Sequence, residues 1–444
     1  MAELLAIGVS HKTAPLELRE RMALTEGHAT GLLGELVASA VVGEAATIST
    51  CNRTEIYLYA SDGVEAESLA LAALAREADI RPTELMGHLY SVRGSEAAEH
   101  LFMVTAGLDS MIIGEAEIQG QVKRSYELAL VEGATGPVLN RLFRGALAAG
   151  KRARTETRIS EGTLSVSQVA VELAQRTLGD LTSRRVLVVG AGETAELTAK
   201  ALAAHGVEAV FVANRRYDRA IGLAQRFGGL AVRFEELPEQ MVAADIVAAS
   251  TSSPHHVIER DALAEVMAER DGRPLLLIDL AVPRDIHPDC REVPGVTLQD
   301  MDDLQSVAER NVSGREGEAG RARSVLRAEL GRFEQWLSTQ EVTPTIAALR
   351  TRADEIVERV LAENATRWEG VTDRDRERLE AMARAIASRI LHEPTLRLRR
   401  SGDDEAAFAY VAALRELFGL DAETEPMSDT ADVREFRRSG REGL

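Results

Sequence analysis

A glycine-rich turn at the end of an apolar run constrains the fold of this chain more than any other feature. Residues 186–189 read Val-Leu-Val-Val, and Gly190, Gly192 and Ala195 follow with the spacing Gly-x-Gly-x-x-Ala. In a βαβ unit that binds a dinucleotide, the first glycine permits a tight turn, the second admits the pyrophosphate, and the third small residue packs helix on strand. The sequence therefore predicts a parallel sheet with a dinucleotide at a helix amino end. A turn that only packs a βαβ unit is the alternative.

Two arginines follow the next apolar run, where NAD-dependent enzymes usually carry an acid for the ribose. The run at residues 209–213 ends before Asn214, Arg215 and Arg216. Arginine near this position accommodates a 2′-phosphate, so we expect NADPH rather than NADH. The predicted cofactor-binding residues are Gly190, Ala191, Gly192, Glu193, Thr194, Ala195, Asn214, Arg215 and Arg216.

The pattern of apolar residues along the 444 positions predicts a multidomain α/β protein of three domains. Residues 1–155 mix strand and helix signals and predict an α+β domain. Residues 156–300 alternate strands with helices, which is typical of a Rossmann-type domain with a parallel sheet. Residues 301–420 show amphipathic helices without strand signals, and residues 421–444 have the composition of a disordered tail.

One segment of the helical region carries a continuous apolar stripe between residues 323 and 337. The stripe consists of Val325, Leu326, Leu330, Phe333, Trp336 and Leu337. Such a stripe must pack against another surface, so it predicts pairing with a partner chain. A helical bundle within the same chain explains the stripe equally well.

Charge and cysteine content limit the partners and the compartment. The 52 basic and 71 acidic side chains give a net charge of −19, which excludes a uniformly basic nucleic-acid coat. Contact with nucleic acid then requires local basic patches. The candidates are residues 141–158 and a second group formed by Arg389, Arg397, Arg399 and Arg400. Solvated helix faces are the alternative for both groups. Two cysteines, no signal-peptide pattern and no apolar run long enough for a membrane span indicate a cytoplasmic protein.

Cys51 lies on a polar turn between two strand-like runs, within Ser-Thr-Cys-Asn-Arg-Thr at residues 49–54. The neighbouring Arg53 and the backbone N–H groups of the turn are expected to favour a thiolate. A thiolate next to a hydride donor can reduce an acyl group through a thioester. A small buried apolar side chain is the alternative for Cys51, and Cys290 is predicted to be structural. No metal is predicted, because the adjacent His255 and His256 have no partner at ligand spacing.

With these features the chain resembles the glutamyl-tRNA reductases of tetrapyrrole biosynthesis. The resemblance rests on the blocks at residues 8–20, 49–55, 100–115, 120–123, 190–194, 279–285 and 391–395. It extends in order to about residue 420 and implies a V-shaped homodimer. Each chain would have an amino-terminal catalytic domain, an NADPH domain and a helical dimerisation domain, joined by a long spinal helix that we place from residue 156.

The resemblance also implies a reaction. The glutamate esterified to tRNA(Glu) would be reduced by NADPH to glutamate-1-semialdehyde, the first committed step of the C5 route to 5-aminolevulinate and porphyrins. Cys51 would attack the acyl carbonyl, and His100 matches a histidine important for activity. The matching substrate-contact positions are Thr50, Asn52, Arg53, Ser110, Glu115, Ala116, Glu117 and Gln121. A channelling complex with glutamate-1-semialdehyde aminomutase is a further expectation of the family.

The residue types support these roles in part. An unpaired Arg53 would present a bidentate fork to the carboxylate of the substrate glutamate. His100 is a candidate to protonate the departing ribose oxygen or to assist the thiolate, although a packed histidine is the alternative. The chain departs from the family where Glu-Pro-Gln is common, because Ala116 and Glu117 follow Glu115. That change puts substrate affinity in doubt and leaves the sulfur chemistry untouched.

Two other functions stay open at this point. An NADP-dependent small-molecule dehydrogenase of the shikimate type would need neither a cysteine nucleophile nor tRNA. An inactive adaptor that binds tRNA would keep the fold without turnover, although Cys51, Arg53 and His100 are all present.

Overall fold

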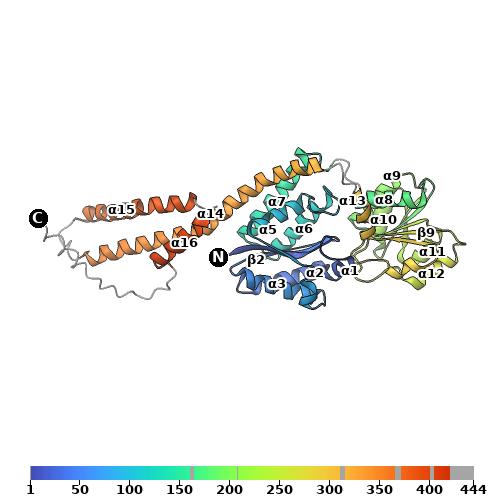
Figure 1. Ribbon diagram of the computed structural model, residues 1–444, viewed down its shortest axis with the longest axis horizontal. Coiled ribbons are helices and arrows are strands. Elements are labelled where there is room, and N and C mark those ends of the chain that lie inside the picture. The colour runs from blue at the N-terminus through green and yellow to red at the C-terminus, as the bar shows by residue number, and fades with distance from the viewer. Residues whose placement is uncertain are drawn as a thin grey trace. The chain divides into compact units, whose positions relative to one another are not determined.

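The computed structural model forms two compact units, Met1–Phe333 and Glu334–Leu444 (Figure 1). The residues described are 2–160, 165–207, 209–310, 316–365, 372–400 and 405–420. The predicted tail at residues 421–444 lies outside this part of the chain. No helix in the described ranges combines the length and apolar character needed to cross a membrane.

The first domain is built on a four-stranded antiparallel sheet. Its strands are β1 (Glu3–Ser10), β2 (Val42–Ser49), β3 (Arg53–Ala60) and β4 (Tyr90–Arg93), in the order β2-β3-β1-β4. Helices connect β1 to β2 and β3 to β4, so the connectivity is the βαββαβ of ferredoxin-like sheets. The predicted α+β domain is confirmed, but β4 was not predicted, because four residues carry too little alternation to be recognised.

Seven helices cover this sheet. They are α1 (Leu16–Met22), α2 (Glu26–Ala38), α3 (Gly63–Glu77), α4 (Pro82–Leu85), α5 (Gly94–Thr105), α6 (Glu117–Val131) and α7 (Pro137–Glu156). Figure 1 shows α2 and α3 on one face and α5, α6 and α7 on the other. The buried carboxylate of Glu44 on β2 accepts hydrogen bonds from the backbone N–H groups of Gly136, Val138 and Leu139 at 2.7–3.0 Å. A carboxylate at a helix amino end satisfies free donors, so it fixes α7 to the sheet.

The second domain is a six-stranded parallel sheet. Its strands are β5 (Arg185–Val189), β6 (Ala209–Asn214), β7 (Leu230–Arg233), β8 (Ile246–Ala249), β9 (Leu275–Asp279) and β10 (Val296–Gln299). The spatial order β7-β6-β5-β8-β9-β10 corresponds to 3-2-1-4-5-6, the order of a dinucleotide-binding sheet. The predicted Rossmann-type fold is confirmed. The strands β5 to β7 extend the sheet in one direction and β8 to β10 in the other, so the strand order reverses between β5 and β8, where ligands of such sheets bind.

Helices cover both faces of the parallel sheet. They are α8 (Val166–Leu178), α9 (Glu193–Ala204), α10 (Tyr217–Arg226), η1 (Phe234–Glu236), α11 (Leu237–Ala243), α12 (Arg260–Ala268), η2 (Pro288–Glu292) and α13 (Met301–Arg310). One apolar core joins the sheet to α8, α9, α10 and α13, and a second core joins it to α11 and α12.

The first domain packs directly against the second. Leu16, Met111 and Ile112 belong to the same apolar core as the residues of α8 and α9. The guanidinium of Arg284, between β9 and η2, donates to the carboxylate of Glu20 on α1 at 2.7 and 2.8 Å. The turn of Cys51 therefore lies where the first domain meets the nucleotide domain.

The long helix of the chain is α14 (Glu316–Glu363), of 48 residues. The spinal helix was expected from residue 156, but α7 ends at Glu156 and the next helix has 13 residues. The apolar stripe of α14 is partly used within the chain, since Leu326, Leu330 and Phe333 are buried. For these residues the intramolecular alternative is correct.

The second unit contains the end of α14 together with α15 (Asp373–Arg400) and α16 (Glu405–Leu417). Ile346, Leu398 and Val411 form its small apolar core. Large apolar side chains nevertheless remain exposed on α14 and α15, namely Ile356, Val360, Met382, Ile386 and Ile390. Exposed apolar side chains at helical spacing are typical of a helix-pairing surface.

Candidate active site

A cavity of about 490 Å³ lies at the carboxyl ends of β5, β6 and β8. Its volume falls in the range of ligand and cofactor pockets. Seven of the nine predicted cofactor residues line it, namely Ala191, Gly192, Glu193, Thr194, Asn214, Arg215 and Arg216. Gly190 and Ala195, which were assigned to the tight turn and to helix packing, do not line the cavity.

The backbone of this turn fits a dinucleotide. Gly190 has a φ of +119°, and a Cβ there would lie 2.1 Å from the carbonyl oxygen of Ser250, so only glycine fits. A Cβ on Gly192 would meet nothing within 4 Å, because its backbone faces the open cavity. The adjacent α9 begins at Glu193 and presents its amino end to the same space. These features suit the pyrophosphate of a nicotinamide dinucleotide.

Three arginines gather on one side of the cavity. Arg215 and Arg216 were predicted, and Arg219, one helical turn further on, was not. The guanidinium carbon of Arg215 lies 5.5 Å from the ring centre of Phe234, and its Nη2 is 3.4 Å from Oγ of Ser253. Arg219 lies in the first turn of α10, the helix that directly follows Arg215 and Arg216 in the chain.

The turn that carries Cys51 is held by local hydrogen bonds. Oγ1 of Thr50 accepts from the backbone N–H groups of Asn52 and Arg53, both at 3.2 Å. Nη1 of Arg19 donates to the carbonyl oxygen of Cys51 at 3.0 Å. Cys51 itself is partly buried and packs on the apolar core that the first domain shares with the nucleotide domain. The nucleophile candidate therefore lies beside the core that joins the two domains.

The environment of Cys51 favours the thiol. Burial, followed by the carboxylates of Glu115 and Glu117, raises its pKa to about 12, while Arg19 opposes them. The expectation that Arg53 would favour the thiolate is wrong, because Arg53 is engaged elsewhere. Burial and Glu117 also raise the pKa of Glu115 to about 7. Deprotonation of Cys51 must therefore accompany attack on a substrate rather than precede it.

Replacing Glu117 by glutamine is expected to make Cys51 more reactive. Loss of one neighbouring negative charge lowers the pKa of the thiol, so alkylation by iodoacetamide should be about three- to tenfold faster at mildly alkaline pH. The rate is measured by intact mass. Glu127→Gln on the same helix is the control, because Glu127 is exposed and pairs with Lys123. Equal rates in both variants and in the unaltered protein would contradict the assigned electrostatics.

Arg53 and Glu55 form the centre of a buried ionic cluster. Arg53 is 1% exposed, and its Nη1 lies 2.6 Å from Oε1 of Glu55 and its Nη2 3.0 Å from Oδ2 of Asp109. Glu55 is completely buried and also accepts from Tyr57 at 2.7 Å, from His100 Nε2 at 2.9 Å and from Tyr90. Burial alone would raise the pKa of Glu55, but Arg53 and His100 hold it well below its usual range. The unpaired guanidinium fork expected from the sequence is therefore not found.

Two histidines flank this cluster. The His100 ring lies edge-on to Tyr90, with ring centres 5.2 Å apart, and its Nε2 bonds to Glu55. His11 has a buried Nδ1 without a hydrogen-bond partner, and burial followed by Arg53 lowers its pKa to about 4. His11 is therefore a neutral imidazole at physiological pH. The contacts of His100 resemble those of a packed histidine, and no contact described for Cys51 involves it.

The remaining predicted substrate residues differ in their burial. Ser110 is buried beside the carboxyl group of Glu115, and its hydroxyl acts to lower the pKa of that group. Ala116 is exposed, and Gln121 is partly buried on α6. The carboxylate of Glu193, which lines the nucleotide cavity, raises the pKa of Glu117 after burial does. The carboxylate of Glu117, near Cys51, thus lies within electrostatic reach of the glycine-rich turn at residues 190–194.

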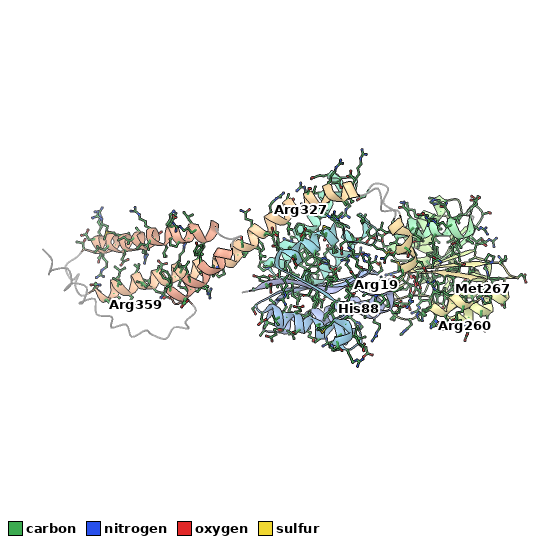
Figure 2. The ribbon with its side chains drawn as sticks, viewed as in Figure 1. Arg19, His88, Arg260, Met267, Arg327 and Arg359 are labelled. Carbon is green, nitrogen blue, oxygen red and sulfur yellow. The ribbon has the colours of Figure 1, made fainter. Side chains whose placement is uncertain are left out.

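Sequence reasoning missed the residues that hold the site together. Arg19, which Figure 2 labels, connects the Cys51 turn to the nucleotide domain, because its Nη2 lies 2.5 Å from Oδ1 of Asp302 on α13. Asp109 and Glu55 neutralise Arg53. A charged residue inside a strand of apolar neighbours, as Glu55 is, was the one signal available, because buried charges are normally paired.

Family models cover most of the chain in three segments. Residues 7–157 match the glutamyl-tRNAGlu reductase N-terminal domain, and residues 321–420 match the dimerisation domain of the same enzyme. Residues 172–307 match the model described as shikimate / quinate 5-dehydrogenase. Together with the cavity, this middle match supports a nicotinamide cofactor.

Similar proteins are known over the full length. A glutamyl-tRNA reductase of Trichlorobacter lovleyi is 40% identical over 432 residues, covering 97% of this chain and all of that protein. The glutamyl-tRNA reductase of Geobacter sulfurreducens has the same identity and coverage. The solved glutamyl-tRNA reductase of Methanopyrus kandleri is 35% identical, covers 95% of this chain and 100% of its own, and has a TM-score of 0.54. With 40% identity over nearly the whole length, the chain belongs to the glutamyl-tRNA reductase family.

Proposed function

We propose that this protein reduces the glutamyl group of glutamyl-tRNA(Glu) to glutamate-1-semialdehyde, with NADPH as the reductant and free tRNA(Glu) as the second product. The observation that carries the proposal is the position of Cys51, which packs against the apolar core shared by the first domain and a nicotinamide-type domain. A nucleophile and a hydride donor are the two components that acyl reduction through a thioester requires. The full-length relatives named as glutamyl-tRNA reductases support the same substrate.

The first chemical step forms a thioester on Cys51. Its Sγ attacks the acyl carbon, a C–S bond forms, and the ester bond to the tRNA ribose breaks. Glu115, whose pKa is raised to about 7 by burial and Glu117, accepts the thiol proton and returns it to the ribose oxygen. NADPH held at the turn of residues 190–195 would supply the hydride that reduces the thioester carbon to the aldehyde. Cys51 is then the leaving group: its C–S bond breaks, and the released thiolate takes a proton from solvent.

The substrate carboxylate would be recognised at the buried ionic cluster. Arg53 can bind it only by releasing Asp109, whose carboxylate also pairs with Lys12. The other proposed substrate or catalytic positions are His100, Thr50, Asn52, Ser110, Glu115, Ala116, Glu117 and Gln121. Exchange of one carboxylate for another keeps Arg53 paired, which avoids leaving a buried charge alone.

The preference for NADPH rests on the three arginines of the cavity. Arg215→Ala is expected to weaken NADPH binding about 10- to 100-fold and to leave NADH binding nearly unchanged, because only NADPH carries the 2′-phosphate. Binding is measured by quenching of protein fluorescence or by calorimetry. Arg226→Ala is the control, since Arg226 is exposed on α10, the helix that follows Arg215, and pairs with Glu196. Equal losses for both nucleotides would assign Arg215 to general phosphate binding.

The partners follow from the same assignment. The dimerisation-domain match supports a homodimer, and the family supports tRNA as the substrate carrier. We further propose a cytoplasmic location, a channelling complex with glutamate-1-semialdehyde aminomutase, and domain limits at residues 1–155, 156–300 and 301–420.

The test is incubation of the purified protein with glutamyl-tRNA, with and without NADPH, followed by an acid quench and intact-mass analysis. A glutamyl adduct on the protein without NADPH, and semialdehyde with it, are the expected results. NADPH binding without adduct or aldehyde would favour the inactive adaptor. Oxidation of NADPH by a small carbonyl compound alone would favour the shikimate-type dehydrogenase.

A further inference from the structure

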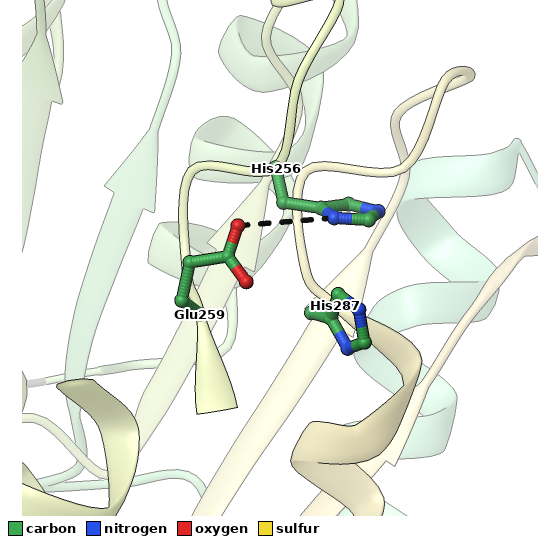
Figure 3. A group of neighbouring side chains, drawn as sticks. All are labelled: His256, Glu259 and His287. Atoms are coloured by element: carbon green, nitrogen blue, oxygen red, sulfur yellow. Dashed lines mark ion pairs between the residues drawn. The ribbon is translucent and has the colours of Figure 1, made fainter. Parts of the chain in front are cut away.

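Two histidines and a glutamate, carried by two loops of the nucleotide domain, lie close together (Figure 3). His256 and Glu259 precede α12, and His287 precedes η2. The three possible ligand atoms all lie within 4.8 Å of one another. The sequence predicted no metal because His255 and His256 had no spaced partner, and that reasoning missed the partner that the fold supplies from another loop.

The backbone holds the two loops together. Ile258 and Ile286 form a parallel β-bridge, and the backbone N–H of His287 donates to the carbonyl oxygen of Ile258 at 3.0 Å. The backbone N–H of Val257 donates to the carbonyl oxygen of Asp285 at 2.6 Å. The Cα positions of both histidines are therefore fixed by neighbours, so a ligand set here needs only side-chain rotation.

The side chains are close to the arrangement that a metal requires. Nδ1 of His256 lies 3.9 Å from Oε1 of Glu259, and the two imidazole centres are 4.8 Å apart with planes at 79°. Ligands about 2.1 Å from a tetrahedral zinc ion are about 3.4 Å apart, so the set must close by about 1 Å. All three side chains are partly or largely exposed and can make that adjustment.

The chemistry of the donors selects the ion. Two imidazoles and one carboxylate suit Zn²⁺ and similar divalent transition metals rather than Mg²⁺ or Ca²⁺, which prefer oxygen ligands. We propose that His256, Glu259 and His287 form a binding site for a divalent transition metal, with zinc as the expected ion and water completing its coordination.

Two further observations bear on the site. Nδ1 of His287 accepts a 3.2 Å hydrogen bond from the backbone N–H of Asp289, and coordination through Nδ1 would replace that bond. The loop that carries His256 also lines the nucleotide cavity through Pro254 and Val257. A bound ion would therefore connect this loop to the segment after β9.

The test is a zinc titration of the full-length protein carrying Cys51→Ser, so that the partly exposed thiol cannot bind the ion. Competition with a chromogenic chelator should give one zinc per chain. His256→Ala and His287→Ala in this background should each weaken binding more than about tenfold, because loss of a ligand exceeds the effect of losing an outer-shell partner. His255→Ala is the matched control, since His255 is the exposed neighbour outside the cluster and should change nothing.

Cobalt substitution gives a second measurement. Co²⁺ bound in place of zinc should show the visible absorption bands of tetrahedral cobalt, without the charge-transfer bands that a thiolate ligand would add. The visible bands should disappear in His287→Ala. Circular dichroism checks that each variant is folded. Zinc binding that is equal in all variants, or absent at micromolar zinc, would overturn the proposal and leave the proposed reduction of glutamyl-tRNA unaffected.

Discussion

Cys51→Ser is expected to lower semialdehyde formation by at least about 10⁴-fold. Glu115 is too weak a base to ionise a serine hydroxyl, and without the sulfur no thioester can form. The glutamyl adduct seen without NADPH should also vanish. Binding of NADPH should not change, because Cys51 does not line the nucleotide cavity. The measurement is a single-turnover assay with glutamyl-tRNA, with the product trapped as a derivative of the aldehyde.

Cys290→Ser is the matched control for this result. Cys290 is buried and its Sγ lies 3.8 Å from the carbonyl oxygen of Ile258, so it has a structural setting. Its replacement should leave the adduct and the aldehyde yield intact, apart from any loss of folded protein. If the adduct persisted in Cys51→Ser and disappeared in Cys290→Ser, Cys290 and not Cys51 would be the nucleophile.

Glu55→Ala should have the largest effect on stability, a loss of about 3–5 kcal/mol in the free energy of unfolding. Removing this carboxylate leaves the guanidinium of Arg53 buried with Asp109 as its remaining charged partner, and it leaves two tyrosine hydroxyls without their acceptor. Denaturant unfolding followed by circular dichroism measures the change.

The control breaks an Arg–Glu pair on the surface instead. Glu35 pairs with Arg76 at 2.5 Å, with both side chains about half exposed. Glu35→Ala should change the free energy of unfolding by less than about 1 kcal/mol, because exposed ion pairs are solvated and screened. A similar small loss in Glu55→Ala would show that the buried cluster relaxes or admits water.

The sequence predicted those parts of the protein whose chemistry is local. The Gly190 turn is recognisable because close backbone approach to Ser250 excludes any side chain there. The strands β5 and β6 were predicted to within one residue of their observed limits, because both are short apolar runs. The strands β7 and β10 were missed, since each has only four residues and includes polar ones.

The electrostatics of the site could not be predicted in the same way. Arg53 was expected to serve Cys51 because the two are close in sequence. In the fold the guanidinium points to Glu55 and Asp109, and Cys51 instead meets Glu115 and Glu117 from another segment. Cys51 lies on the turn before β3, whereas Arg53 is the first residue of that strand, so nearness in sequence does not imply contact here. The metal cluster was missed for the same reason, because His287 reaches His256 only through a β-bridge.

The protonated state of Cys51 also bears on how the protein withstands oxidants. Peroxide converts a thiolate to a sulfenic acid, whereas a thiol reacts slowly. A pKa raised from 9.0 to about 12 lowers the thiolate fraction about a thousandfold at neutral pH. The same burial and carboxylates that require deprotonation during attack thus shield the sulfur from sulfenylation between turnovers.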